Sequence, residues 1–239
     1  MSDSIIYNRI LLKISGEALK GKYELGYDNN AIDEIVCNLT CVLDHGIELG
    51  LVIGAGNIWR GKIGKNLGMN PIAADYMGML GTVMNSLALK DAFDRKGIKC
   101  EIFTSFNMSP IGEPFVASTA IKYLEEGRVV IFAGGTGHPF FTTDTTAALR
   151  ALEVNAEALL KATNVDGIYT DDPKKNPNAV RFENISYEDA LYKNLKIMDS
   201  TAFSLCRDNK LPIIVFNFSD PENLINILKG DTEVGTVVS

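Results

Sequence analysis

The sequence predicts an α/β fold with three layers, helix on sheet on helix, around a mainly parallel sheet. Two observations support this. Short apolar runs rich in Val, Ile and Leu recur along the chain, and amphipathic helical patterns lie between them. Continuous apolar runs are typical of parallel strands buried on both faces, and their alternation with helices is the pattern of an α/β sandwich. We expect strands at residues 9–14, 48–53, 99–104, 128–133, 158–161 and 212–217.

The expected helices have recognisable ends. Gly46 and Gly127 follow two of them, and glycine is common just after the end of a helix. The longest has Asn70 as a candidate N-cap and Pro71 at its first helical position. These features place helices at 30–44, 71–96 and 117–126, and the start of a fourth at 142–144.

Two glycines, Gly78 and Gly81, lie inside the longest expected helix. A glycine in a helix interior costs about 1 kcal/mol relative to alanine. We therefore expect a compensating contact, preferably close packing against a neighbouring helix or subunit.

No repeat, low-complexity segment or linker divides the chain, so we expect one domain over residues 1–239. Within it, an N-terminal lobe at about 1–160 and a C-terminal lobe at about 161–239 are expected to share one sheet. The amino-acid composition changes at residues 163–179, which are rich in Asp, Asn, Pro and Lys and have no apolar periodicity. A structureless segment of that length is usually functional or mobile.

Composition and charge argue against several classes of function. The 239 residues are 46% hydrophobic and 22% charged, as in an ordinary folded domain. The net charge of −7 gives no excess of positive charge for binding nucleic acid or an anionic membrane. The first apolar run is short and contains Arg9 and Lys13, so we expect neither a signal peptide nor a membrane span. The expectation is a cytoplasmic protein with reduced cysteines.

Three potential metal ligands, Cys37, Cys41 and His45, are spaced by four residues along the first expected helix. Only three ligands lie in line, and no CxxC or HxxxH motif accompanies them. We expect ordinary surface or contact residues here and no metal site.

A glycine turn after the fourth expected strand is the most informative segment. The run 129–133 leads into Gly134, Gly135, Thr136 and Gly137, and the chain restarts as a helix at 142–144. Free backbone N–H groups and a helix dipole converge in such a turn, which favours an anion. The segment also carries hydroxyls and two aromatic rings. It predicts a pocket for a small, phosphorylated, partly aromatic molecule, and a plain βα connection is the alternative.

Polar and glycine-rich residues also follow the first two expected strands. Lys13 to Gly16 follow the first, and Gly54 to Asn57 follow the second, with Arg60 close behind. Because ligands bind beyond the carboxyl ends of the strands in open α/β sheets, these residues are expected on one rim. The GxGxxG, P-loop and protein-kinase motifs are absent from the sequence, as is GxSxG.

The charged groups of this rim suit phosphoryl transfer. Lys13, Lys161 and Arg60 would supply positive charge, and Asp144 and Asp199 would supply carboxylates. Phosphoryl transfer requires chiefly positioning and positive charge around the migrating group. The alternatives are solvated lysines and, for the two aspartates, helix caps.

Five segments carry a resemblance over nearly the whole chain. They read KISGEAL, GAGNxxRG, GTGHPFFTTDTTAALR, KATNVDGIYTDDP and LKIMDSTAF, in this order. Together they closely resemble the bacterial uridylate kinases, a branch of the amino-acid kinase fold family. The resemblance implies reversible transfer of the ATP γ-phosphate to UMP, giving UDP and ADP, in pyrimidine nucleotide biosynthesis on the route to CTP. It implies direct in-line transfer without a covalent enzyme intermediate.

The same resemblance implies the site residues. UMP contacts would come from Ala55, Gly56, Arg60, Asp75, Thr136, Gly137, His138, Pro139, Phe140, Phe141, Thr142 and Thr143. ATP contacts would come from Lys13, Ile14, Ser15, Gly16, Gly56, Arg60, Thr163, Asn164, Tyr169 and Asp172. Lys13, Arg60 and Lys161 would stabilise the transferring group. We hypothesise that Asp144 helps to place magnesium and that Asp199 orients Lys13.

Cofactor and partners follow from the resemblance as well. Mg²⁺ would accompany ATP, and the family forms hexamers, is inhibited by UTP and is often activated by GTP. Residues 21–26 lie where some relatives sense GTP, and a plain glycine-bounded turn is an equal alternative. The chain departs from the usual family pattern at Ala55, His138 and Asn164.

Two competing functions remain open from the sequence. The first keeps the fold but uses a small carboxylate or carbamate as the acceptor, and Asp75 with residues 136–143 argues against it because they suit a nucleotide better. The second is a non-catalytic binding or storage protein, and the presence of Lys13, Arg60 and Lys161 argues against that.

Overall fold

The computed structural model describes residues 4–171, 173 and 175–239. The six predicted strands are confirmed as β1 (Arg9–Ile14), β2 (Glu48–Ile53), β3 (Cys100–Thr104), β5 (Val129–Ala133), β6 (Ala158–Thr163) and β10 (Ile213–Asn217). Three further strands are β4 (Glu113–Pro114) and β9 (Asn184–Ile185), at the two edges of the sheet, and β11 (Gly235–Val238), between β10 and β9. Within the described residues these nine form one sheet in the order β4-β3-β5-β2-β1-β6-β10-β11-β9. Pairing is parallel except between β10 and β11.

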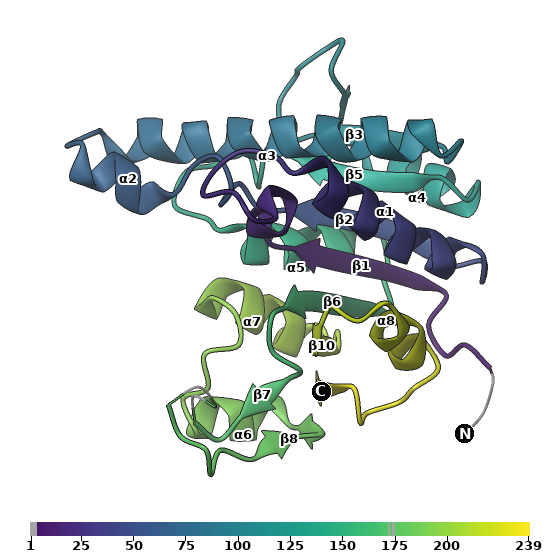
Figure 1. The fold of residues 1–239 in the computed structure, drawn as a ribbon, viewed down its shortest axis with the longest axis vertical. Coiled ribbons are helices and arrows are strands. Elements are labelled where there is room, and N and C mark those ends of the chain that lie inside the picture. Colours follow the sequence, from purple (N-terminus) through teal and green to yellow (C-terminus); the bar gives the residue numbers. More distant parts are fainter. Residues whose placement is uncertain (1–3, 172, 174) are drawn as a thin grey trace.

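Helices cover both faces of the sheet, which confirms the three-layer α/β architecture. Along β1, Ile10, Leu12 and Ile14 lie in one buried cluster and Leu11 lies in the other, because successive side chains of a strand point to opposite faces. One face packs against α1 (Asn29–Leu43), α3 (Pro71–Arg95) and α8 (Pro221–Leu228), and α1 crosses in front of β1 and β2 in Figure 1. The other face packs against α4 (Ala117–Glu125), α5 (Thr143–Glu153), α6 (Tyr187–Tyr192) and α7 (Ser200–Asp208).

The predicted helix starts are confirmed by their caps. Asn70 Oδ1 accepts a hydrogen bond from the Ile72 amide at 2.9 Å, and Pro71 is the first residue of α3. The Thr142 hydroxyl caps α5 by accepting from the Asp144 amide at 3.0 Å. Among the described helices, none is both long enough and apolar enough to cross a membrane.

Several elements have no counterpart in the sequence prediction. The three helices of the C-terminal part, α6, α7 and α8, were not predicted. The other unpredicted elements are a 3-10 turn, η1 (Gly16–Lys20), a short helix, α2 (Gly61–Asn66), and an antiparallel ribbon of β7 (Ile168–Tyr169) with β8 (Arg181–Phe182). The segment 163–179, expected to lack regular structure, contains β7. A two-residue strand is too short to produce apolar periodicity, so its ribbon depends on the partner strand.

The two helix glycines of α3 pack against a loop of the same chain. A Cβ on Gly81 would lie 2.9 Å from the Ala55 Cβ, and a Cβ on Gly78 would lie 3.6 Å from the Trp59 ring. Gly81 therefore allows the loop after β2 to approach the helix. Within this chain the close contact is with this loop and not with a neighbouring helix, and the expected contact with a subunit stays a prediction.

Candidate active site

Two lysines and one aspartate meet at the carboxyl ends of β1 and β6. Lys13 and Lys161 are register partners on these adjacent strands, and Asp144 lies in the first turn of α5. Lys161 Nζ donates a hydrogen bond to Asp144 Oδ2 at 2.7 Å. Lys13 Nζ lies 2.8 Å from Asp144 Oδ1, close enough for an ion pair although the angle is not that of a hydrogen bond. One carboxylate thus bridges two ammonium groups.

Burial and charge oppose each other in this cluster. The three side chains are between 13% and 17% exposed. Burial alone would raise the pKa of Asp144, but Lys13 and Lys161 lower that pKa to below its usual value. Burial lowers the pKa of Lys161 despite the attraction of Asp144. The site therefore holds two positive charges close together, stabilised by one ionised carboxylate.

The second predicted carboxylate, Asp199, has a different place from the one expected. It caps α7 by accepting from the Ala202 amide at 2.9 Å, and it accepts hydrogen bonds from the hydroxyls of Thr142 and Thr145. The carboxylate that contacts Lys13 is Asp144, so the expectation that Asp199 orients Lys13 is corrected. Asp199 instead ties the start of α5 to the start of α7.

A pocket of about 240 Å³ lies between the glycine turn, α3 and the loop after β2. Of the residues predicted to contact the acceptor, Ala55, Asp75, Phe141, Thr142 and Thr143 line it. Sequence reasoning missed the other wall residues, among them Trp59, Met79 and Thr82. Trp59 is the only tryptophan of the chain and lies in the glycine-rich loop after β2. That position could have identified it as a pocket residue.

Five other predicted acceptor residues lie in the loop that follows the glycine turn, whereas Gly56 and Arg60 belong to the loop after β2 and are not among the pocket walls. The Phe140 amide donates to Asp75 Oδ2 at 2.8 Å, and Phe140 has a φ of 70° and is 74% exposed. The Thr136 hydroxyl accepts from the His138 amide at 3.2 Å, which makes a local turn. Gly137 and Pro139 complete the loop, and neither these residues nor Thr136, His138 or Phe140 is among the pocket walls. Asp75 therefore holds the loop through one carboxylate oxygen.

The turn after β1, at Ser15 and Gly16, and the loop after β2, at residues 54–57, pack directly on each other. A Cβ on Gly16 would collide with the Gly54 carbonyl oxygen, so only glycine allows this approach. Asn85, in the interior of α3, donates to the Gly54 carbonyl at 2.6 Å and exchanges hydrogen bonds with Asn57. Both asparagines are fully buried. Asn85 was missed by sequence reasoning, and a polar residue on the buried face of a helix was its signal.

Arg60 lies at the mouth of this arrangement and is half exposed. Its Nη2 lies 2.7 Å from Glu17 Oε1, and its Nε donates to the Gly56 carbonyl at 3.3 Å. Arg60 therefore bridges η1, which follows Lys13, and the loop after β2. It does not join the Lys13, Asp144 and Lys161 cluster through any contact within the described part of the chain.

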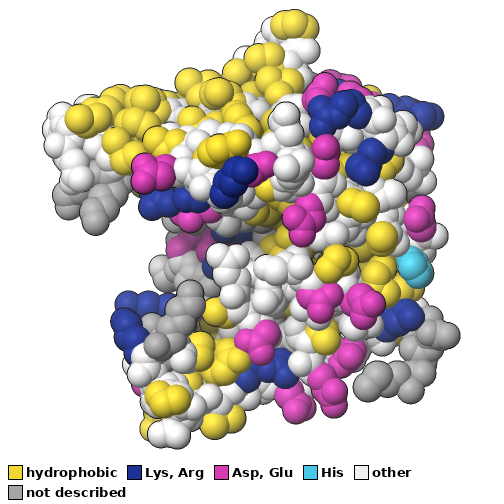
Figure 2. Space-filling model, in the orientation of Figure 1, with side chains coloured by type: hydrophobic (Ala, Val, Ile, Leu, Met, Phe, Trp, Pro, Cys, Tyr) yellow, Lys and Arg dark blue, Asp and Glu magenta, His cyan; other side chains and the backbone are white. Residues whose placement is uncertain are grey.

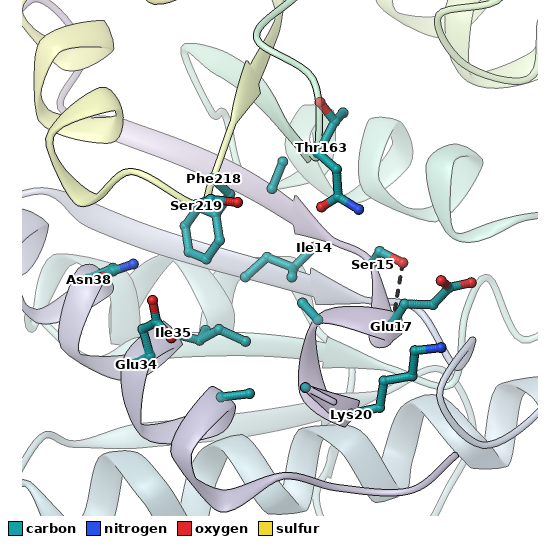
Figure 3. A pocket seen from close by; sticks show the side chains of 15 residues that line it. Ile14, Ser15, Glu17, Lys20, Glu34, Ile35, Asn38, Thr163, Phe218 and Ser219 are labelled. Carbon is teal, nitrogen blue, oxygen red and sulfur yellow. Dashed lines mark hydrogen bonds between the residues drawn. The ribbon is translucent and has the colours of Figure 1, made fainter. Parts of the chain in front are cut away.

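Two cavities flank the end of β6, on the side predicted to hold the donor. One, of about 570 Å³, is lined by Lys161, Thr163 and Tyr169, together with Lys193 and Lys196, which sequence reasoning missed. The other, of about 470 Å³, extends from Ile14, Ser15, Thr163 and Asn164 towards α1 and Phe218 (Figure 3). Asp172 lies outside the described residues. Figure 2 shows the molecule hollowed between the part that carries α2 and α3 and the part that carries β7.

Comparison with known proteins places this arrangement in a family. The model of the amino acid kinase family matches residues 8–217. UMP kinase from Bacillus anthracis has 37% sequence identity and a TM-score of 0.95, with 98% of this chain and 96% of that chain covered. UMP kinase from Ureaplasma parvum also has 37% identity, with a TM-score of 0.92 and coverage of 98% and 99%. Uridylate kinase from Archaeoglobus fulgidus has 26% identity, a TM-score of 0.74 and coverage of 96% and 99%. This chain belongs to the amino acid kinase family.

Proposed function

We infer that this chain is a UMP kinase, which transfers the γ-phosphate of ATP to UMP and gives UDP and ADP, reversibly. One observation carries the inference. The Lys13, Asp144 and Lys161 cluster stands between the acceptor-side pocket and the donor-side cavities, where a migrating phosphoryl group needs positive charge. Its sequence relatives at 37% identity over 98% of the chain are UMP kinases. We place the activity in pyrimidine nucleotide biosynthesis, on the route to CTP.

UMP would bind in the N-terminal lobe, at about 1–160. The pocket of about 240 Å³ offers the rings of Trp59 and Phe141 to a flat base. Asp75 Oδ2 holds the loop through Phe140, which leaves Oδ1 to accept a uracil N–H or a ribose hydroxyl. The backbone of Ala55 and Gly56 and the guanidinium of Arg60 would hold the UMP phosphate, beside the cap of α5.

ATP would bind in the C-terminal lobe, at about 161–239. Its adenosine would occupy the cavity of about 570 Å³ beside Tyr169, and its phosphates would follow Thr163 towards the turn at Ser15 and Gly16. Lys193 and Lys196 add positive charge to this wall. The direct packing of Gly16 on Gly54 brings the donor turn and the acceptor loop together, which in-line transfer requires.

The transfer is a single displacement. An oxygen of the UMP phosphate attacks the γ-phosphorus of ATP, the new P–O bond forms, and the bond to the bridging oxygen of ADP breaks. The electron pair of that bond stays on the ADP phosphate. Lys13 and Lys161 neutralise charge on the transferring group, and Arg60 neutralises charge on the acceptor. Asp144 keeps the two ammonium groups in place without taking part in bond making.

Magnesium would enter as part of the donor, bound to the ATP phosphates. Both oxygens of Asp144 face lysine ammonium groups, so Asp144 does not fit the hypothesised role of a magnesium ligand. Mg²⁺ is commonly held by substrate phosphates and water with few protein ligands.

The test is incubation of the purified protein with ATP, Mg²⁺ and each nucleoside monophosphate in turn, with ADP release as the readout. We expect rapid release with UMP and slow release with CMP, AMP and GMP. Equal rates across the monophosphates would contradict the assignment of the pocket beside Asp75. Transfer only to small carboxylates, or to none of these acceptors, would replace the proposed function by one of the two competing functions.

A second copy of this chain is the proposed partner of α3. Its outer face exposes large apolar side chains at helical spacing, with Leu80 46% and Met84 50% exposed. Figure 2 shows hydrophobic side chains gathered over the region of α3. The remaining members of this face are Ile72, Tyr76, Met77 and Leu87. We propose assembly through this face, towards the hexamer of the family, and Met84→Glu should lower the mass measured by light scattering.

Two regulators belong to the proposal as well. UTP shares its uracil and ribose with UMP and would inhibit by competing for the acceptor pocket. GTP would activate, and residues 21–26 are one candidate for its contact. Initial rates with and without each nucleotide test both effects, and unchanged rates would remove the corresponding regulator.

A further inference from the structure

A buried arginine on α5 has no part in the site described above. The Arg150 side chain is 7% exposed, and a buried guanidinium is costly unless it is paired and hydrogen-bonded. Its Nη1 pairs with Glu153 Oε2 at 2.5 Å, its Nη2 donates to Ser105 Oγ at 3.1 Å, and its Cζ lies 3.8 Å from the centre of the Phe115 ring. The ion pair with Glu153 and the Phe115 ring compensate the positive charge of Arg150. The hydrogen bond to Ser105 connects Arg150 to the glycine turn.

Ser105, directly after β3, is the residue around which the glycine turn folds. Its amide donates to the Ala133 carbonyl at 3.1 Å, and its hydroxyl donates to the Gly135 carbonyl. A Cβ on Gly137 would lie 3.2 Å from the Ser105 Cβ, so the two backbones are in close contact. Ser105 therefore contacts the turn at its beginning, middle and end.

Arg150 fixes the direction of the Ser105 hydroxyl. A guanidinium has donors only, so Ser105 Oγ must accept from Arg150. Its single hydrogen is then left for a carbonyl of the turn, and the Gly135 carbonyl is nearer than the Ala133 carbonyl, which lies at 3.4 Å. Gly135 has a φ of 63° and lines the acceptor-side pocket. On the other side of the turn, the Gly134 amide donates to the Thr82 hydroxyl at 2.9 Å. The turn is held between α3 and the Arg150 to Ser105 relay.

We propose that Arg150 is a positioning residue that acts through Ser105 to set the place of the glycine turn, and thereby the affinity for UMP. The proposal rests on the proposed function, whose acceptor pocket it refines. Arg150 touches neither the donor side nor the Lys13, Asp144 and Lys161 cluster within the described residues. Arg150 should therefore affect the affinity for UMP and leave the affinity for ATP unchanged.

The decisive variant is Ser105→Ala, which removes the hydroxyl and leaves the Arg150 pair with Glu153 intact. Loss of one hydrogen bond that positions the turn should raise KM for UMP about threefold to tenfold. KM for ATP should stay within twofold of wild type. Calorimetric titration of UMP without ATP should show the same rise in Kd. An unchanged KM and Kd for UMP would overturn the proposal.

Two further variants separate positioning from stability. Arg150→Met keeps the apolar stem over Phe115 but removes the donor, and with Ser105→Ala it should raise KM for UMP no more than either change alone. Glu153→Gln is the matched control, because it weakens the ion pair and leaves the hydrogen bond to Ser105. It should lower the Tm without changing KM for UMP. Additive effects of the first pair, or an equal rise in KM from Glu153→Gln, would reduce Arg150 to a structural role.

Different results would contradict the UMP kinase activity and the positioning role of Arg150. A wild-type protein that transfers no phosphate to UMP would remove the proposed function. A wild-type protein that phosphorylates UMP, with Ser105→Ala kinetically identical to it, would remove only the role of Arg150 and Ser105. If Arg150→Met does not fold, Ser105→Ala alone decides.

Discussion

Replacement of Asp144 by asparagine tests the centre of the proposed mechanism. Asp144→Asn keeps the size of the side chain but removes its charge, leaving the Lys13 and Lys161 ammonium groups without a carboxylate between them. The asparagine oxygen can accept from one lysine only, and its NH₂ group then faces the other. The change therefore breaks two ion pairs, of 2.8 and 2.7 Å, in a site where no side chain is more than 17% exposed.

The magnitude follows from distance and burial. Two unit charges about 4 Å apart attract by roughly 4 kcal/mol at an effective dielectric constant of 20, and removing one partner of a buried pair typically costs about 3–5 kcal/mol. Loss of one preorganised electrostatic group in an active site usually lowers kcat by about 10²- to 10³-fold. We expect Asp144→Asn to lower kcat within that range and to lower the free energy of unfolding by about 3 kcal/mol.

The pH dependence provides a second measurement. Because the pKa of Asp144 is lowered in the folded protein, its contribution to stability is present at neutral pH. That contribution is lost in acid, as the pH falls through the folded pKa below the ordinary value of 3.8. Asp144→Asn should therefore flatten the acid side of the stability profile. Burial already lowers the pKa of Lys161, and loss of Asp144 should lower it further, so the alkaline limb of kcat should shift to lower pH.

The assay is coupled detection of ADP with saturating UMP and ATP, together with chemical denaturation from acid to neutral pH. Asp33→Asn is the control, because Asp33 forms an exposed pair with Arg95, and such pairs contribute at most about 1 kcal/mol. A kcat for Asp144→Asn within twofold of wild type would refute the role of the bridged lysines.

Three other perturbations test the geometry. Gly81→Ala places a Cβ 2.9 Å from the Ala55 Cβ, so overpacking should destabilise the fold by about 1–3 kcal/mol and raise KM for UMP, and Ala55→Gly in the same chain should reverse both effects. Asp199→Ala removes the cap of α7 and the acceptor for two threonine hydroxyls. It should lower stability by about 1 kcal/mol or more and raise KM for UMP, whereas an unchanged thermal midpoint would contradict the contacts described. A thiol reagent should label two cysteines in the native protein and four in denaturant, because burial raises the pKa of two thiols to about 12. The reactive pair is Cys37 and Cys41, and the buried pair is Cys100 and Cys206.

The parts of the fold that follow from local patterns were predictable. Long apolar strands, and helices with a side-chain cap or a following glycine, carry their signals within a few residues, as Asn70 and Thr142 show. The ribbon of β7 and β8 was not predictable, because two-residue strands carry no periodicity. The presence of Trp59 and Asn85 at the site also escaped prediction, since each reaches it through a contact with a distant segment.

The sequence by itself determined the α/β class, the positions of the main strands and helices, and the glycine turns and cations that indicate phosphoryl transfer. Only the tertiary structure decided which carboxylate serves which lysine. Asp144 lies between Lys13 and Lys161 because β1 and β6 are neighbours in register and α5 begins beside them, whereas Asp199 is drawn to the threonines of α5. Local patterns depend on short-range interactions along the chain. The pairing of charges depends on where packing places residues that are far apart in sequence.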